Sequence, residues 1–457
     1  MDILRSAMTR IIDRIMSTPA ISGSHEWMLL IKTPTETITP LSVDEVHLVR
    51  HYTRAIGDSL SVKITLGAGD YAHGLYPARS KLKACLIKTP LGKSLVYSKN
   101  PHLNVDTLWY DAHLYTNSSP AIEQNTRKLG SREQGNLNSI IDLEMMLVDP
   151  ALDAMRKSTT DTIIHNTTGA QAIRAVMSHA FEAIKRNTGR VIKGVDLAPG
   201  YNPQIMNNIR VPAHTPLVEV FRVINTEVGG IYGAGLWAYL QGSHYFLYPP
   251  YDSARYGKAP QRLTCVNVSG QQLQHAERTW MKEDGEVFYL STGESIHQDF
   301  SEREQLNEGN AVRFLDPVKL FDDYVKVSDN RAVVDQSRVA NEFTADRRPD
   351  GLNIIKHADR PITSRGNVEA SKLALRSGFF VQTRWDNANP ELIIPGMPCR
   401  YLYLNTEKQV MVLHGSVVGV QARDTPHNAL IRDRKFTTQA AVTLFLNRKP
   451  VEAAQSV

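Results

Sequence analysis

The chain has 457 residues, 42% of them hydrophobic and 22% charged, a composition typical of a globular protein with more than one core. Lys and Arg outnumber Asp and Glu by only 52 to 47, and no dense basic run concentrates that surplus, which argues against a nucleic-acid-binding protein. No run of about 18 apolar residues occurs, so the sequence predicts no transmembrane helix.

The N-terminal segment, residues 1–21, is expected to contain an amphipathic helix. Charged residues interrupt its apolar ones, so it lacks the continuous apolar core of a signal peptide. The apolar residues that recur at helical spacing are Leu4, Met8, Ile11, Ile12 and Ile15. We expect this stripe to pack on the same chain or on a partner.

Alternating apolar and polar residues predict a series of strands between residues 22 and 120. The alternation is clear in residues 60–66 (LSVKITL) and in residues 82–88 (LKACLIK), and LWYDAHLYT repeats it. One face of each strand is apolar and the other is polar. These strands therefore predict a small antiparallel barrel or sandwich.

After a further strand in SIIDLEMMLVDP, the pattern becomes α+β. Residues 168–186 carry an apolar stripe at helical spacing, which predicts a helix that Gly189 ends. A second helix is expected to begin with Thr215 as N-cap and Pro216 in its first turn. The hairpin WAYLQGSHYFLY follows it.

Residues 296–369 are polar and predict an arm or long loops, which at this length are usually functional. Strands return toward the C-terminus in FFVQTRW, CRYLYLN, QVMVLHGSVVGVQA and AVTLFLNR. The chain thus reverts to β patterning after an inserted α+β section, which predicts two β-domains.

The stretch GGIYGAGLWA, residues 229–238, matches G-x-G-x-x-A, a form of the dinucleotide-binding fingerprint. That site needs a strand before the glycines and a helix after them, because helix N–H groups bind the pyrophosphate. Here a predicted helix precedes the glycines and a hairpin follows. We therefore expect a helix C-cap and a tight entry into the hairpin, and no nucleotide cofactor.

Other motifs that could carry chemistry have simpler structural interpretations. Asp252 and Arg255 are expected to form a local ion pair that orders a loop, since such pairs are common outside active sites. Ser416 comes near the form of a nucleophile elbow, but it lies in a strand run and is expected to be a sheet residue. The sequence therefore predicts no catalytic residue and no cofactor site.

Three cysteines, Cys85, Cys265 and Cys399, are far apart and have no Cys or His at metal-ligand spacing. Their odd number argues against a disulfide framework. We expect them to be small buried hydrophobic residues of a reducing compartment, and we predict no metal site.

Four segments in order along the chain carry a resemblance to a known family. They are HYTRAIGDSLSVKITLGAGDY with LYPARSKL; DLEMMLVDPALDAMRKSTTDTIIHNTTGAQAI leading into VIKGVD; GGIYGAGLWAYLQGSHYFLYPPYDSARY after a helix; and IIPGMPCRYLYLN before a glycine-rich strand pair. Together they resemble the baseplate hub proteins of contractile-tailed bacteriophages, which are related to the N-terminal part of type VI secretion spike proteins.

The resemblance implies a mainly β fold with two tube-type antiparallel β-barrels and an inserted α+β region. The implied divisions are a first barrel at 22–135, a second barrel from 136–160 and 370–457, an α+β domain at 161–295 and a polar arm at 296–369. Three chains would present six barrels, join the six-fold tail tube to the three-fold central spike, and initiate tube assembly.

The resemblance also implies partners and a location. The expected partners are further copies of the chain in a homotrimer, the spike protein, the tail tube protein and peripheral baseplate proteins. DNA would pass through the lumen without specific binding. The protein would reside in the virion baseplate after assembly in the host cytoplasm, without enzymatic activity or membrane insertion.

Two alternatives remain open at this point. A particle-borne cell-wall hydrolase commonly needs a pair of carboxylates in a cleft, and the sequence nominates no such pair. A glycan- or receptor-binding tail module is suggested by the aromatic residues of the hairpin, although we favour their packing on the helix at 216–228. These aromatic residues are Trp237, Tyr239, Tyr245, Phe246 and Tyr248.

Overall fold

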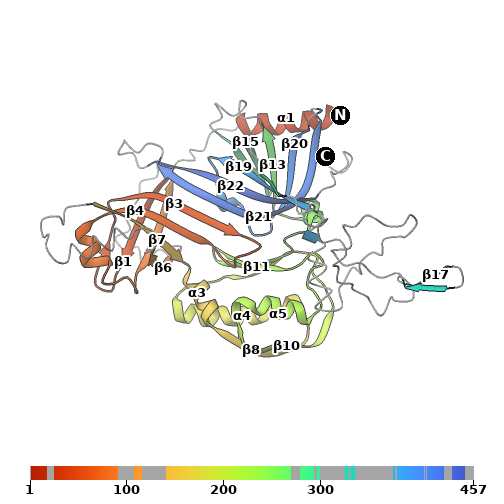
Figure 1. Ribbon diagram of the computed structural model, residues 1–457, viewed down its shortest axis with the longest axis horizontal. Coiled ribbons are helices and arrows are strands. Elements are labelled where there is room, and N and C mark those ends of the chain that lie inside the picture. Colours follow the sequence, from red (N-terminus) through yellow and green to blue (C-terminus); the bar gives the residue numbers. More distant parts are fainter. Residues whose placement is uncertain are drawn as a thin grey trace.

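Two long strands, β21 (Val410–Pro426) and β22 (Phe436–Asn447), run across the middle of the molecule and belong to a large mixed sheet (Figure 1). A layer of helices lies on one side of them. The expected mainly β fold with an inserted α+β region is confirmed. The computed structural model describes residues 2–17, 25–90, 108–115, 140–268, 278–292, 296–298, 325–328, 331–334, 374–375, 378–405, 407, 409–426 and 435–447.

Eight of the described strands close into an antiparallel ring, here called the first ring. Its order is β1 (His25–Lys32), β5 (Lys83–Pro90), β6 (Trp109–Leu114), β7 (Ile140–Val148), β4 (Ser59–Gly67), β3 (Ser42–His51), β21 and β22. The pair His25 and Phe436 returns β22 to β1. The alternating residues Leu60, Val62 and Ile64 are buried inside, as their pattern predicted.

A second ring uses residues 410–416 of β21 and residues 439–447 of β22. Its order is β19 (Gly378–Asp386), β22, β21, β20 (Pro398–Leu404), β13 (Arg262–Val268), β15 (Glu286–Thr292) and β14 (Trp280–Glu283). Side chains complete the circle, because Tyr289 Oη lies 2.6 Å from Thr383 Oγ1 and its ring lies 4.9 Å from that of Trp385. The pairs of β13 with β15 and β20 are parallel, so this ring is mixed.

The strand pairing divides the chain differently from the expected boundaries. β7 lies within residues 136–160, which were expected to join the C-terminal strands, but it pairs with β4 and β6 of the first ring. β13 to β15 lie within residues 161–295, expected to be α+β, but they complete the second ring. These two assignments are wrong because alternation shows which face of a strand is apolar, not which strand lies beside it.

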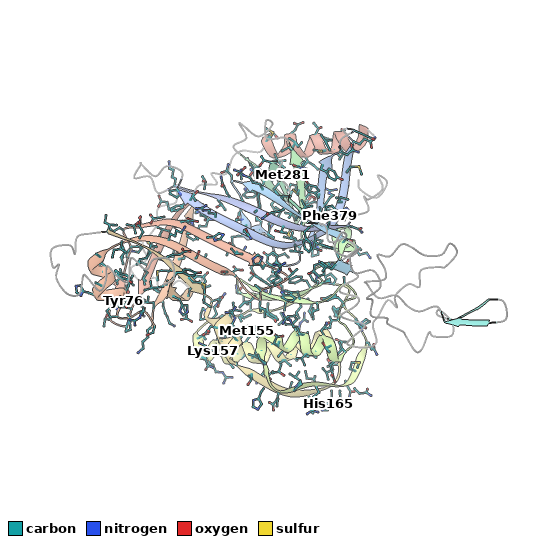
Figure 2. All side chains as sticks on the ribbon, viewed as in Figure 1. Tyr76, Met155, Lys157, His165, Met281 and Phe379 are labelled. Carbon is teal, nitrogen blue, oxygen red and sulfur yellow. The ribbon has the colours of Figure 1, made fainter. Side chains whose placement is uncertain are left out.

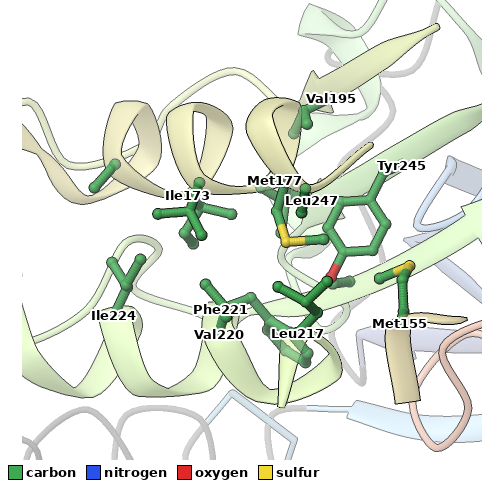
Figure 3. Close-up of a cluster of buried hydrophobic side chains, with 14 of the residues drawn as sticks. Met155, Ile173, Met177, Val195, Leu217, Val220, Phe221, Ile224, Tyr245 and Leu247 are labelled. Atoms are coloured by element: carbon green, nitrogen blue, oxygen red, sulfur yellow. The ribbon is translucent and has the colours of Figure 1, made fainter. Parts of the chain in front are cut away.

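The helical layer consists of α3 (Pro150–Lys157), α4 (Gly169–Thr188) and α5 (Val220–Glu227), packed on the two-stranded sheet of β8 (Thr159–Thr168) and β10 (Ile205–Pro216) (Figure 1). Thr168 caps α4 by accepting from Gln171 N at 3.3 Å, and Gly189 ends it at φ +75°. Figure 3 shows the resulting core, in which Ile173 and Met177 face Phe221 and Ile224. The predicted apolar stripe of residues 168–186 is confirmed.

The predicted N-cap at Thr215 is wrong. β10 continues to Pro216 after a register shift between Val211 and Thr215, and Thr215 pairs with Thr160 of β8. A short 3₁₀ turn, Leu217–Glu219, then leads into α5. Thr215 Oγ1 donates to the carbonyl of Pro212 at 2.6 Å instead of capping the helix.

The N-terminal helix α1 (Asp2–Ser17) confirms the predicted amphipathic segment. It lies over the outer face of the second ring (Figure 1). Met8 and Ile15 are buried there against Val266, Leu290 and Leu402. The stripe therefore packs on its own chain.

Shorter elements complete the described chain. They are β2 (Thr37–Ile38), a π-helical turn at Asp70–Leu75, β9 (Gly194–Leu197), β11 (Trp237–Gln241), β12 (His244–Tyr248), 3₁₀ turns at Ser253–Lys258 and Pro390–Leu392, β16 (Ile296–Gln298), β17 (Val325–Ser328) and β18 (Arg331–Val334). Within the predicted arm at 296–369, β16 pairs with β19, and β17 pairs with β18. The rest of that prediction lies outside the described residues.

Gly415 lets β21 approach its neighbour β22 closely, and this close approach yields a stability prediction. A Cβ at Gly415 would overlap the carbonyl oxygen of Phe445. We expect Gly415→Ala to lower the free energy of unfolding by about 1–3 kcal/mol through overpacking, measured by urea denaturation. Gly194→Ala is the control, because a Cβ there meets nothing within 4 Å. Equal losses of stability in the two variants would contradict the conclusion that the close approach of β21 and β22 requires a glycine at position 415.

Candidate functional site

The candidate site is the place where β21 and β22 pass from one ring to the other. β21 pairs with β20 along 410–416 and with β3 along 419–424. The register of β21 against β22 shifts between Val417 and Gly419. Tyr52 N donates to the Val418 carbonyl at 3.0 Å within this bulge. Bulges bend a strand and re-aim its side chains, so the same strand can serve two rings.

A buried arginine beside this passage ties three parts of the chain together. Arg50, on β3, is 3% exposed. Its Nε lies 3.2 Å from both carboxylate oxygens of Asp58, and its Nη2 lies 3.2 Å from both oxygens of Glu391. Its Nη1 donates to the Pro390 carbonyl at 3.0 Å. The fork-shaped guanidinium suits such bidentate contacts.

The charge on Arg50 is retained despite its burial. Burial alone lowers the pKa of Arg50, but the attraction of nearby groups, Asp58 foremost, raises this pKa above its ordinary value. Asp58 also accepts a hydrogen bond from Tyr239 Oη on β11 at 2.9 Å. The network therefore joins the first ring, the turn at Pro390–Leu392 and the hairpin of the α+β section.

A second buried pair lies where the first ring closes. His25 Nε2 is 2.9 Å from Asp424 Oδ2, and both residues are at most 5% exposed. Trp27 Nε1 donates to the same oxygen at 2.8 Å, and Lys88 Nζ lies 3.7 Å from it. Burial raises the pKa of Asp424, but the hydrogen bond from His25 and the charge of Lys88 outweigh it, so the net direction is downward.

A cavity of about 290 Å³ lies at one end of the first ring, where Leu152 of α3, Arg190 and Leu240 of the hairpin also line it. Asp58, Asp149 and Asp424 lie on its wall. Each is paired with a cation or His: Asp58 with Arg50, Asp149 with Arg190 at 3.2 Å, and Asp424 with His25. Each of these pairs therefore links two segments of the chain that line the cavity.

The glycine stretch at 229–238 has the structural role that was expected. Gly229 and Gly230 follow α5 with φ of 70° and 115°, and Gly235 has φ 82°. Strand β11 begins at Trp237, directly after these glycines. No helix follows them, so the geometry of a pyrophosphate site is absent from this stretch.

The predicted pair of Asp252 and Arg255 forms, with 3.7 Å between Oδ2 and Nε. Arg255 also donates to the carbonyls of Pro249 and Gly396 at 3.1 and 2.7 Å. Ser416 is fully buried in β21, and its Oγ donates to the Asp252 carbonyl at 2.9 Å. These three residues anchor a loop to β21, which confirms the structural interpretation of the pair and of Ser416.

The aromatic hairpin is enclosed on both faces. Trp237 meets Phe221 of α5 edge to face at 5.9 Å, and Tyr245 meets Phe181 of α4 at 5.8 Å. Tyr239 and Tyr248 share a face of the hairpin with Trp237 and lie in the core of the second ring, whereas Tyr245 lies on the other face. The packing on the helix at 216–228 is thus confirmed for Trp237. Tyr239, Tyr245 and Tyr248 are at most 2% exposed and cannot form a glycan platform.

The three cysteines are buried and carry free thiols. Burial raises the pKa of Cys85 to about 11. In the part of the chain that the structure describes, no cluster of three or more His, Cys, Asp or Glu could hold a metal ion. Within that same part, no helix is both long enough and apolar enough to cross a membrane.

The sequence matches no protein-family model and no curated protein. The structure is similar to a tail protein from Neisseria meningitidis (12% identity, 92% of this chain and 96% of that one, TM-score 0.44). It is also similar to a 43 kDa tail protein of prophage MuSo2 from Shewanella oneidensis (9% identity, 91% and 98%, TM-score 0.43).

A third similar structure is an Escherichia coli protein, described as a component of the type VI secretion system with structural similarity to T4 bacteriophage tail proteins (10% identity, 90% and 76%, TM-score 0.35). At such identities and TM-scores, the likeness by itself assigns no function to this chain.

The Arg50 network predicts a large loss of stability when the cation is removed. Arg50→Met leaves Asp58 and the Pro390 carbonyl without their buried partner, so the free energy of unfolding should fall by at least about 2 kcal/mol in urea denaturation. Arg384→Met is the matched control, because that arginine is exposed and pairs with Asp386 at 3.0 Å. Its loss should stay below about 1 kcal/mol. Equal losses would argue against a special role of Arg50.

The pair at the closure predicts a pH dependence. Because the pKa of Asp424 is lowered in the folded protein, its ionised form stabilises the fold above about pH 5, and this contribution disappears as the pH falls through the lowered value. The stability difference between the wild type and Asp424→Asn should therefore be largest near pH 7 and shrink toward pH 3 in urea titrations. Asp386→Asn, a control at a partly exposed carboxylate paired with the exposed Arg384, should show a small difference. A difference for Asp424→Asn that grows toward acid would refute this assignment.

Proposed function

We propose that this chain is a structural protein of a phage tail, a trimeric baseplate hub that joins the six-fold tail tube to a three-fold spike. The observation that carries the proposal is the pair of strand rings sharing β21 and β22. Two rings per chain become six in a trimer, which matches a six-fold tube on one side. The trimer keeps three-fold symmetry for a spike on the other.

The interior contacts support this role mechanically. The shared strands and the Arg50 network leave little freedom for one ring to move against the other. A symmetry adaptor needs this rigidity, because the spacing of its rings must match the first ring of tube protein. Closure of the first ring also removes the free strand edges that would otherwise pair without control.

The proposal includes the partners and location implied by the resemblance. The tube protein, the spike and peripheral baseplate proteins would bind the trimer in the virion baseplate, after assembly in the host cytoplasm. DNA would pass through the lumen without specific binding. The protein would act by templating assembly and would carry no catalytic activity.

Light scattering and particle imaging of the purified chain, alone and mixed with its spike and tube proteins, test the proposal. We expect a trimer with six-lobed rings that nucleates tube growth. A chain that remains monomeric in the presence of both partners would overturn it. A muralytic assay separates the hydrolase alternative, since robust cleavage of peptidoglycan would contradict a purely structural role.

A further inference from the structure

Strand β8 leaves one edge of its sheet open. It pairs with β10 alone, and no other described strand hydrogen-bonds to it. The two strands lie on the outer side of the helical layer, away from both rings (Figure 1). An open edge presents N–H and C=O groups to any extended segment of suitable sequence.

The outward face of β8 carries an unusual set of side chains for an exposed strand. Asp161, Ile163 and His165 alternate on this face, and Ile163 is 56% exposed. Figure 2 shows His165 at the outer side of the layer. Its Nδ1 lies 2.5 Å from Asn208 Oδ1 on β10, a contact that orients the imidazole.

These residues are symmetric about Ile163. If a second copy of β8 runs antiparallel with Ile163 opposite Ile163, each Asp161 faces His165 of the second copy. Thr159 then faces Thr167, and the apolar contact lies at the centre. Hydrogen-bonding pairs, such as a carboxylate opposite an imidazole, and β-branched pairs directly across two strands stabilise pairing. The strand is therefore complementary to itself in polarity and shape.

A groove beside the open edge provides room for the second strand. It has a volume of about 660 Å³ and lies between β8 and α4. Ala175, Ala180 and Ala183 form part of its helical wall. Small residues let another backbone approach, and the inward threonines of a second β8 could enter this space.

We propose that two copies of this chain associate through their β8 edges, antiparallel and centred on Ile163, to form a four-stranded β10–β8–β8–β10 sheet. This contact is independent of the proposed tail role, because it uses the outer side of the helical layer and neither ring. It gives the chain a second, two-fold interface, which can link two chains or two trimers.

Cysteine cross-linking tests the register. In Ile163→Cys the two-fold axis places the new thiols opposite each other, so mild oxidation should produce a covalent dimer that reduction dissolves. The native cysteines are buried and do not compete. Ile205→Cys is the control, because Ile205 is 66% exposed on the same sheet but lies on β10. Absence of the Ile163→Cys dimer, or equal cross-linking in the control, would overturn the proposal.

A charge exchange tests the pairing of Asp161 with His165. His165→Asp places two carboxylates opposite one another, twice per dimer, and Asp161→Lys removes the carboxylate that faces the imidazole. We expect both to raise the dimer dissociation constant, His165→Asp at least about tenfold, in analytical ultracentrifugation. The double variant places opposite charges across the two strands and should return to within about threefold of the wild type. Wild-type chains without a two-fold association, or single variants with unchanged affinity, would refute the interface.

Discussion

The sharing of β21 and β22 between two rings is the constraint on which the rest of the structure depends. β21 pairs with the second ring along 410–416 and with the first along 419–424, whereas β22 pairs with β19 of the second ring along 439–447 and with β1 of the first at Phe436. The register shift after Val417 and the missing side chain at Gly415 make this possible. The two cores are therefore connected through continuous hydrogen-bonded backbone rather than through a linker.

Buried charged groups lie at two places along β21 and β22. Arg50 joins β3 to Glu391 and the Pro390 carbonyl beside the passage between rings, and Asp424 binds His25 where the first ring closes. Removing charges from water is costly, so such pairs are retained only when their partners are well placed. We interpret both pairs as contacts that specify which segments of the chain pack together, a role that they share with the apolar cores.

The helical layer is attached to this frame by the hairpin of β11 and β12. One face of the hairpin packs on α4 and α5, and the other enters the core of the second ring through Tyr239 and Tyr248. This attachment leaves the sheet of β8 and β10 on the outer side of the layer, where its open edge is available. A rigid pair of rings and an exposed edge can thus serve separate contacts in one assembly.

The sequence by itself determined the elements whose pattern is local. Alternation located the strand at 60–66, the apolar stripe of 168–186 and Gly189 defined α4, and the order of elements excluded a pyrophosphate site at 229–238. Only the tertiary structure decided that β7 joins the first ring, that β13 to β15 join the second, and that Thr215 is in a strand. It also decided that Arg50 is buried among carboxylates. The reason is physical: periodicity encodes which face of a segment is apolar, whereas strand partners and ion pairs depend on contacts between separate segments, up to 341 positions apart for Arg50 and Glu391.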